Sequence, residues 1–420
     1  MTDGTATGVT PASVPAGRQA SPTYLLILLG CLGVALGGVL ALNLLLGQRS
    51  LGSVEMVKAA SDWQQMTRGV TYPPPVTANR PFKTLRLHDR IPEINGVVFG
   101  PSTAMGLTAG AFPKEVRIYN FSQTANPLHS TIPEAEYVAR HFGERVKWLF
   151  LSIDWAVGVP YQEGAPGTMD LSRQAVMKGS ALPEVSLQRK LIDAISWPRV
   201  RNLWQLLRGV WRSDDKLAAF RRAFFEMSSG DYRCPDGTLA RDFDTINRGI
   251  CAGFRYDGSA TFTDGTRVNP DRGQRLVQAA AAPSSKYSRA IVPSGGNLNP
   301  AFFERLASLA RAYRKQGGTL VLFAPPLIPR LEQALAESKH AGIVVGRTKA
   351  ALDAWGRREG VVIIDAGASE RFGCVTQEFL DEHHAFGECY SKVFGRFWKA
   401  RAAGRVQPGL WPPLTRGESR

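Results

Sequence analysis

The segment Val146-Lys147-Trp148-Leu149-Phe150-Leu151-Ser152-Ile153 is an almost continuous run of apolar residues. A strand with one face in water alternates apolar and polar side chains, whereas a strand covered on both faces is apolar nearly throughout. Central strands of parallel sheets are covered in this way. The run therefore predicts a buried strand in the middle of a parallel sheet that is flanked by helices.

The sequence on both sides of this run alternates between strand and helix patterns. Further strands are predicted at residues 96–100, 116–121, 320–324 and 361–365, and helices at residues 133–142, 300–316 and 347–358. Alternation of this kind predicts an α/β fold, with an open sheet whose strands are joined by right-handed crossovers.

Residues 160–295, approximately, interrupt the alternation. They contain a Trp- and Arg-rich helical stretch from Trp197 to Phe225, followed by a section rich in Gly, Asp and Thr from Ser228 to Asn269. Asp-Gly pairs in this section are turn signals. We expect a helical and irregular insertion that forms a cap or side wall beside the functional edge of the sheet.

The N-terminal part contains a segment from Tyr24 to Gly47 that has no charged residue. Its length is sufficient to cross a hydrocarbon core of roughly 30 Å at about 1.5 Å per residue. Because it exceeds the apolar part of a typical signal peptide, we predict an uncleaved transmembrane helix, with a cleaved signal as the alternative. The predicted organisation is a disordered cytoplasmic tail (1–22), a transmembrane helix (23–47), a juxtamembrane connector (48–93), the main domain (94–400) and a C-terminal tail (401–420).

One of the five cysteines, Cys31, lies in the apolar segment, which leaves four in the rest of the chain. Their spacing forms two local pairs, so among three connectivities we predict the disulfides Cys234–Cys251 and Cys374–Cys389. Four free thiols are one alternative. A metal site is disfavoured because no Cys-x-x-Cys or His-rich spacing is present. Disulfides form in oxidising compartments, so pairing predicts a domain outside the cytoplasm.

The charge balance is strongly basic, with 51 Lys and Arg against 36 Asp and Glu and a net charge of +15. Such a surface attracts polyanions, which include acidic polysaccharide, anionic lipid and nucleic acid. A basic surface that binds no specific polyanion is the simplest interpretation and the one that the charge balance alone favours. The sequence has no nucleic-acid-binding motif, so nucleic acid is disfavoured as a partner. The sequence predicts neither a cofactor nor a metal.

Two short segments carry candidate catalytic chemistry. Gly100-Pro101-Ser102-Thr103 places Ser102 between a predicted strand and a helix, which is the geometry that exposes a nucleophile. Asp381-Glu382-His383-His384 places an Asp three residues before His384, a spacing with which a carboxylate can orient a general base. Ligands bind at the carboxyl ends of strands in open α/β sheets. We therefore expect Ser102, Asp381 and His384 to converge at one edge of the sheet.

These segments resemble the sequence blocks of the SGNH/GDSL hydrolase superfamily. The nucleophile block, Gly-Asp-Ser, is similar to Gly100-Pro101-Ser102, and the Asp-x-x-His block is similar to Asp381-Glu382-His383-His384. Tyr119-Asn120-Phe121-Ser122 resembles the second block, and Leu151-Ser152-Ile153-Asp154 resembles the third, which usually reads Gly-x-Asn-Asp. Tyr390 matches a Tyr often found six residues beyond the His.

The resemblance covers residues 95–155 and 300–395, approximately, and not the middle of the chain. It implies a flavodoxin-like three-layer sandwich with a central parallel sheet. The chain is most similar to the membrane-anchored, extracytoplasmic branch, which includes the accessory proteins of alginate O-acetylation and teichoic-acid D-alanylation. The resemblance implies that Ser102 is the nucleophile, that His384 is the general base, and that Asp381 orients His384.

The same resemblance points to residues that bind the oxyanion or the substrate: the backbone N–H of Ser102, with Asn120, Ser122 and Asp154. Ser122 takes the position of a Gly, which leaves a backbone donor in place. Asp154 takes the position of an Asn, and an ionised carboxylate cannot donate a hydrogen bond. The loss of one such donor typically costs roughly a hundredfold or more in rate. Three readings are open: Asp154 is protonated, another side chain (Asn120, Asn126 or Gln123) substitutes, or the site is slow or inactive.

Each catalytic candidate also has a simpler interpretation. Ser102 is a preferred residue for capping a helix N-terminus. His384 is alternatively a surface residue, and Asp381 is alternatively a cap of the predicted helix 388–397, a role that its distance from that helix disfavours. His383 is an alternative base because a partner two residues away is within reach in a loop.

We expect a serine esterase or O-acyltransferase that acts on acyl esters, such as acetyl esters, of an envelope or exported polysaccharide. Its partners would be an acylated glycan or other ester, the membrane through its N-terminal helix, and an envelope polysaccharide machine. One alternative is a catalytically weak or inactive scaffold of such a machine. The other is a membrane-proximal lipid or thioester hydrolase, for which the near-helical spacing of three tryptophans is a hint: Trp197, Trp204 and Trp211.

Overall fold

The computed structural model describes residues 22–45, 54–71, 79–124, 126, 128–153, 197–225, 230–243, 249, 251–261, 267–292, 295–339 and 341–414. The described residues divide into two compact units. One unit holds α1 (Pro22–Leu45) and the first half of α7 (Trp197–Arg212), and the other holds the remaining elements.

α1 is apolar along its whole length and is long enough to cross a membrane. A signal sequence near the N-terminus has the same properties, so α1 is an anchor or a signal. It begins one residue before the predicted transmembrane segment, at Pro22.

A six-stranded sheet in which every pair of neighbouring strands is parallel forms the centre of the second unit. In spatial order its strands are β11 (Gly409–Trp411), β10 (Val362–Asp365), β9 (Thr319–Ala324), β4 (Trp148–Ser152), β2 (Gly96–Phe99) and β3 (Ile118–Asn120). The apolar run of residues 146–153 forms β4, which pairs with β2 on one side and β9 on the other. Leu149, Phe150 and Leu151 are fully buried, which confirms the prediction of a covered central strand.

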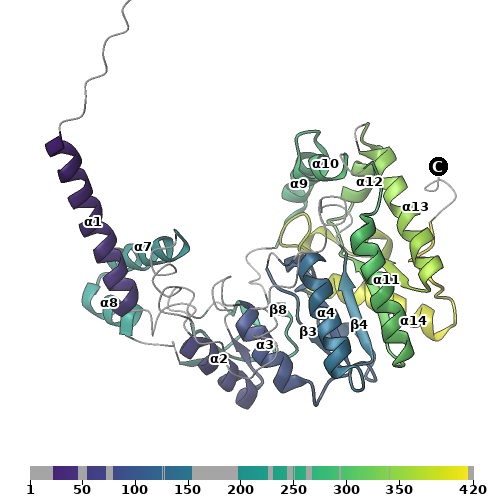
Figure 1. Cartoon of the computed structure of the whole chain (residues 1–420), viewed down its shortest axis with the longest axis horizontal. Coiled ribbons are helices and arrows are strands. Elements are labelled where there is room, and N and C mark those ends of the chain that lie inside the picture. Colours follow the sequence, from purple (N-terminus) through teal and green to yellow (C-terminus); the bar gives the residue numbers. More distant parts are fainter. Residues whose placement is uncertain are drawn as a thin grey trace, which may run out of the picture. The chain divides into compact units, whose positions relative to one another are not determined.

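Helices α4 (Leu128–Phe142), α11 (Pro300–Lys315) and α13 (Gly342–Glu359) lie side by side against the sheet (Figure 1). α14 (Gly387–Ala402) packs aromatic side chains on the central strands, where Phe394 contacts Phe150 of β4 and Phe323 of β9. The remaining helical elements of this region are η2 (Ser102–Ala104), η3 (Ala109–Ala111), α9 (Pro270–Ala281), α10 (Lys286–Ile291), α12 (Leu331–Glu337), η6 (Ser369–Phe372) and η7 (Thr376–Glu378).

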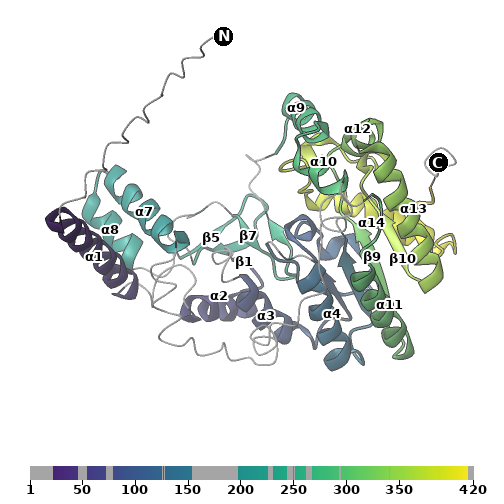
Figure 2. The ribbon, with the colours of Figure 1, turned by 45° about the horizontal axis from the view of Figure 1, so that its top comes forward.

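A second, five-stranded sheet of mixed direction is built from short strands (Figure 2). In spatial order these are β5 (Asp231–Arg233), β6 (Leu239–Arg241), β1 (Val70–Thr71), β7 (Gly253–Phe254) and β8 (Ala260–Thr261). Helices α2 (Val54–Thr67) and α3 (Asn79–Arg90) pack on each other and contribute Trp63 and Phe82 to a core that also contains Phe254. The described parts of the region expected to be a connector (48–93), residues 54–71 and 79–93, therefore contribute to a folded subdomain together with described parts of the insertion.

Two further differences from the sequence prediction concern the ends of elements. α4 begins at Leu128, five residues before the predicted start, with Pro133 inside the helix. Residues 401–420 were expected to form only a tail, but β11 pairs in parallel with β10 and extends the sheet. A three-residue strand gives too short a pattern to be recognised in the sequence.

Both predicted disulfides are present, Cys234–Cys251 and Cys374–Cys389, with Cα atoms 5.6 and 5.1 Å apart. Cys31 in α1 is the free cysteine. Because disulfides persist in oxidising compartments, the disulfides and the apolar N-terminal helix indicate a secreted or extracytoplasmic protein.

Candidate active site

Ser102 begins the short helix η2, which two residues separate from the carboxyl end of β2. The preceding Pro101 is extended and makes no side-chain cap, and the Ser102 side chain is not used as a cap either. The carbonyl of Ser102 accepts the backbone N–H of Met105, which closes the turn. This strand-to-helix turn leaves the Ser102 hydroxyl at the edge of the sheet.

The second half of the site is a tight loop between η7 and α14. Phe379 and Ala385 form an isolated antiparallel bridge, and Leu380 N–H donates to the carbonyl of His384 at 2.9 Å. Inside the loop, Oδ1 of Asp381 accepts the backbone N–H groups of His383 and His384, both at 2.9 Å. These bonds fix the loop and aim the other carboxylate oxygen at the His384 ring.

Asp381, His384 and Ser102 form a continuous hydrogen-bonded chain. Oδ2 of Asp381 lies 2.7 Å from His384 Nδ1, and His384 Nε2 lies 2.8 Å from Ser102 Oγ. An ionised carboxylate only accepts, so Nδ1 of His384 carries the proton and Nε2 is left to accept from the Ser102 hydroxyl. His384, rather than the alternative His383, is the ring that reaches Ser102.

The protonation state of Asp381 is set by competing effects. Burial by itself raises its pKa, but the hydrogen bond from His384 and the positive charge that the two histidines can carry outweigh burial. The net result is a pKa well below the usual range of Asp. Asp381 is therefore a stable acceptor for His384 at neutral pH.

Contacts between the two loops hold this geometry. Gly106, in the Ser102 loop, lies so close to the Ala385 carbonyl that a Cβ at this position would clash with it. The hydroxyl of Tyr390, in the first turn of α14, donates to the carbonyl of Thr103 at 2.5 Å. The residue after the candidate nucleophile is thus bonded to the helix that follows the candidate base.

The second sheet also supports the Ser102 loop, through the turn between β7 and β8. Asp257 accepts the backbone N–H of Ala109 through its side chain at 2.7 Å, and its carbonyl accepts the N–H of Asn120 at 2.7 Å. Gly258 has a positive φ of 83°, and a Cβ there would strike the Asn120 carbonyl, so only Gly fits this approach.

The predicted oxyanion residues have other partners. The buried amide of Asn120 donates to the carbonyls of Ala104 and Leu107, both at 2.8 Å, so it braces the Ser102 loop and has no amide proton to spare. The backbone N–H of Ser122 donates to Asn120 Oδ1 at 2.9 Å. Asp154 lies outside the described residues.

Asn126, considered as a substitute donor, is also engaged. Its side chain accepts from Arg80 at 2.8 Å and donates to Glu134 at 2.9 Å, within an ion-paired group of α3 and α4. These bonds use Asn126 to join helices rather than to bind a ligand.

Several buried polar atoms at the same sheet edge have no hydrogen-bond partner in the described part of the chain. They are Thr103 Oγ1, Ser122 Oγ, Gln123 Nε2 and Ser152 Oγ. Gln123 is close to the nucleophile turn, because its backbone N–H donates to the Gly100 carbonyl at 3.0 Å. Ser152, at the end of β4, packs against Gly100 from the other side. Buried polar atoms are normally paired, so these groups are candidates for a contact with a ligand or water.

A cluster that the sequence did not reveal surrounds His383. The buried Tyr287 of α10 places its hydroxyl 2.9 Å from His383 Nδ1, and Lys286 forms an ion pair with Glu382 at 2.8 Å. The hydrogen bond from His383 and that from Lys286 outweigh burial and lower the pKa of Glu382 to about 2. Tyr287 lies in the insertion, far from any motif, and no local pattern singles it out.

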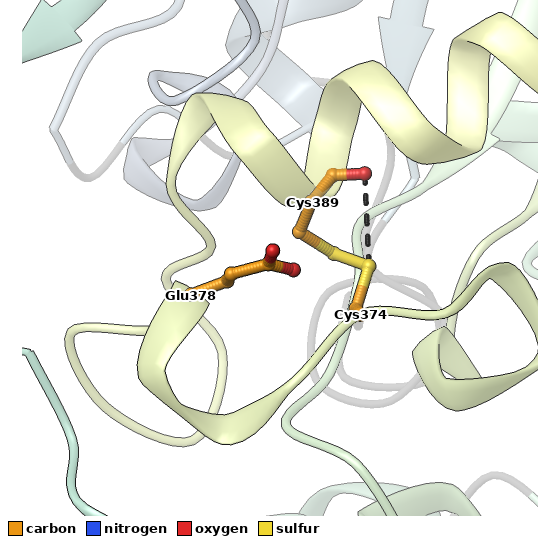
Figure 3. A group of neighbouring side chains, drawn as sticks. All are labelled: Cys374, Glu378 and Cys389. Carbon is orange, nitrogen blue, oxygen red and sulfur yellow. Dashed lines mark hydrogen bonds between the residues drawn. A yellow bond between two sulfur atoms is a disulfide. The ribbon is translucent and has the colours of Figure 1, made fainter.

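The Cys374–Cys389 disulfide joins Cys374, which lies between η6 and η7, to the first turn of α14 (Figure 3). The carboxyl group of Glu378 lies beside it and accepts from Lys392 at 2.5 Å. Cys374, Glu378 and Cys389 are close enough to share an ion, but disulfide sulfurs are not thiolate ligands.

Asp381, His383 and His384 also lie close enough together to hold a metal ion. A metal on His384 would have to replace its hydrogen bond to Asp381 or to Ser102, because each ring nitrogen makes one of them. Both ring nitrogens of His384 are thus already used in hydrogen bonds, one to Asp381 and one to Ser102, along which a proton can move.

Comparison of the chain with protein-family models, curated proteins and solved structures found no match. The class of protein is thus defined by the structure alone. It is an α/β protein with a six-stranded parallel sheet and a hydrogen-bonded Ser, His and Asp at the carboxyl edge of its strands.

Proposed function

We propose that this chain is a membrane-anchored, extracytoplasmic serine esterase or O-acyltransferase of the SGNH type. The observation that carries the proposal is the hydrogen-bonded chain from Asp381 through His384 to Ser102. A nucleophile, a base and a residue that orients the base are the minimum set for acyl transfer through a covalent intermediate. The order Ser, Asp, His along the chain and the parallel sheet support the SGNH assignment.

In the proposed reaction, Ser102 Oγ attacks the carbonyl carbon of an acyl ester while His384 Nε2 takes the hydroxyl proton. The tetrahedral intermediate collapses when the ester C–O bond breaks, and His384 returns the proton to the departing alcohol. Water or a sugar hydroxyl then attacks the carbonyl carbon of acyl-Ser102, and its proton passes to His384 Nε2. The bond between the acyl carbon and Ser102 Oγ breaks, and His384 returns the proton to Ser102, which releases the acid or the new sugar ester. Water makes the enzyme an esterase, and a sugar makes it an O-acyltransferase.

The developing oxyanion needs preorganised donors. The backbone N–H of Ser102 donates to no described residue, so it is one donor. We assign the second to Nε2 of Gln123, which is buried at the same edge and has no partner among the described residues. Gln123 would then supply the amide donor that an Asn provides in the SGNH third block, where this chain has Asp154.

The substrate class follows from location and charge. An extracytoplasmic domain with a net charge of +15 is suited to an acidic glycan, so we propose acyl esters of an envelope or exported polysaccharide as substrates. The membrane, through α1, and an envelope polysaccharide machine would be its partners.

A serine-directed test decides whether the site is catalytic. The full-length protein in detergent is incubated with a fluorophosphonate probe and with p-nitrophenyl acetate. We expect labelling and turnover that fall by roughly a thousandfold or more in Ser102→Ala. Ser308→Ala, which changes an exposed serine of α11, should behave as the wild type. Turnover equal in Ser102→Ala and the wild type would remove Ser102 from the mechanism.

The second candidate is a weak or inactive scaffold of an envelope polysaccharide machine. The observation that favours it is that both Asn120 and the Ser122 backbone N–H are used inside the protein. Absence of probe labelling in a folded wild-type protein would select this candidate. A third, a lipid or thioester hydrolase, is distinguished by a panel of phospholipid, acyl-thioester and acetylated oligosaccharide substrates.

A further inference from the structure

Large apolar side chains are exposed on α7 and on α8 (Lys216–Phe225), in addition to those of α1. Trp211 is 79 % exposed, Leu217 72 % and Trp204 66 %. Nine large apolar residues outside α1 are exposed among the described residues, and five of them lie in these two helices: Trp204, Leu207, Trp211, Leu217 and Phe220. These exposed apolar residues are concentrated in one short stretch of the chain, and exposed apolar patches mark interaction surfaces.

The apolar residues of α7 lie on one side of the helix. Trp204, Leu207 and Trp211 are separated by three and four positions, so their side chains share a face. Leu203 of the same helix is buried, which shows that α7 packs on the protein through a neighbouring part of its surface. The exposed face is therefore a second apolar face, and not the one that holds the helix in place.

Basic side chains border this face. Arg208 follows Trp204 by four residues, Arg212 follows Arg208 by four, and both are exposed. Residues 197–225 contain seven basic residues and two acidic ones, for a net charge of +5. Tryptophan and leucine side chains beside exposed arginines are typical of a helix that lies in the interface of an anionic bilayer.

We propose that α7 and α8 form a second membrane contact and lie on an anionic phospholipid surface. Trp204 and Trp211 would enter the headgroup region, while Arg208 and Arg212 would bind lipid phosphates. Tryptophan suits this region because its ring is apolar and its N–H is polar. Each basic residue near an anionic surface contributes about 1 kcal/mol. The proposal is independent of the proposed enzymatic activity.

The position of α7 in the chain supports a membrane as the occupant. The first half of α7 belongs to the same compact unit as α1, the helix that is long enough to cross a bilayer. If α1 is an anchor, α7 is held near lipid at a high effective concentration. A second copy of the chain is a poorer occupant, because pairing two faces of this kind would bring like charges together.

A labelled full-length chain tests the proposal. Cys31→Ser removes the free thiol, and Leu207→Cys places an environment-sensitive fluorophore on the exposed face. The matched control carries the same fluorophore at Ser308→Cys on α11. Both proteins are reconstituted through α1 into nanodiscs of phosphatidylcholine and phosphatidylglycerol that contain a spin-labelled lipid.

We expect a blue-shifted emission at position 207 and quenching by the spin-labelled lipid several times stronger than at position 308. Quenching at 207 should fall in Arg208→Glu/Arg212→Glu and in nanodiscs of phosphatidylcholine alone. Water-like emission without quenching at position 207 would overturn the proposal. A blue shift without lipid quenching would also overturn it, because the face would then be covered by protein.

Discussion

His384 Nε2 lies 2.8 Å from Ser102 Oγ, although 282 positions separate the two residues in the sequence. The contact depends on the order of the strands, because β2 delivers Ser102 and the loop that follows η7 delivers His384 to the same edge. It also depends on local fit, since Gly106 meets Ala385 and Tyr390 bonds to Thr103. The proposed catalysis relies on an imidazole whose tautomer is set by Asp381.

The role of Asp381 is tested by Asp381→Asn. The new amide keeps an oxygen for the two backbone N–H groups, so the loop should persist, but its NH₂ would donate to Nδ1 of His384. That donation places the ring proton on Nε2, where it opposes the base function. We expect turnover of p-nitrophenyl acetate to fall on the order of a thousand- to ten-thousandfold at neutral pH.

Glu382→Gln is the matched control for this variant, because it removes the adjacent carboxylate, which bonds to His383 rather than to His384. It should retain most of the turnover. Equal losses in the two variants would mean that the negative charge of the loop matters, and not the orientation of His384.

The Cys374–Cys389 disulfide should affect catalysis as well as stability, because Asp381 and His384 lie within the loop that it closes. Cross-linking a loop of about 15 residues stabilises a protein by roughly 3 kcal/mol, mainly through the unfolded chain. Cys374→Ala/Cys389→Ala is therefore expected to lower the free energy of unfolding by about this amount and to reduce turnover per folded molecule.

The other disulfide provides a control of similar loop length. Cys234 and Cys251 are 17 positions apart, compared with 15 for Cys374 and Cys389, and they join parts of the second sheet. Cys234→Ala/Cys251→Ala should cost a comparable free energy of unfolding, measured by denaturant titration, and leave turnover largely unchanged. An equal loss of turnover in both double variants would mean that either disulfide affects turnover through the stability of the whole domain, and not through the position of Asp381 and His384.

The features that were predicted correctly from the sequence are those whose cause is local. Residues 146–153 are apolar because β4 is covered on both faces, and the spacing of three between Asp381 and His384 is enough to define their contact. The cysteine pairs were also local in sequence. Each of these follows from residues that are near one another along the chain.

The features that were missed depend on distant partners. β1 has two residues, Val70 and Thr71, and exists because β6, 170 positions later, pairs with it. The use of Asn120 as a brace depends on the carbonyls of Ala104 and Leu107, and no sequence pattern reports those bonds. Tyr287 reaches His383 only through the packing of α10.

The assignment of Gln123 as an oxyanion donor predicts a specific kinetic effect. Gln123→Leu keeps the volume of a buried side chain but removes the amide that lacks a partner among the described residues. Because the donor acts mainly on the transition state, kcat should fall about a hundredfold with little change in KM.

Ser122→Ala distinguishes the role of the Gln123 amide from that of the neighbouring Ser122 hydroxyl, because this buried hydroxyl also lacks a partner in the described chain. We expect less than a tenfold effect there. A large loss in Ser122→Ala with normal turnover in Gln123→Leu would assign the oxyanion to the hydroxyl instead.

Lys83 links stability to pH. It is fully buried, and its ammonium donates to the carbonyls of Asn120 and Gly258 and lies over the ring of Phe254. Burial lowers the pKa of Lys83 to about 7, against an opposing effect of Asp257. Between pH 7 and the ordinary Lys value of about 10.4, the unfolded chain binds a proton that the folded chain does not, so stability rises with pH in this window.

The measurable quantity is the difference in unfolding free energy between the wild type and Lys83→Met, which cannot bind that proton. As pH rises from 7 to 10, the wild type should gain stability relative to the variant by a few kcal/mol at most, since each pKa unit corresponds to about 1.4 kcal/mol. Lys147→Met, which removes a partly exposed ammonium from two backbone carbonyls, controls for the lost hydrogen bonds. If the Lys83→Met difference is constant over this range, Lys83 keeps its proton when buried, and its bonds to Asn120 and Gly258 are strong enough to offset desolvation.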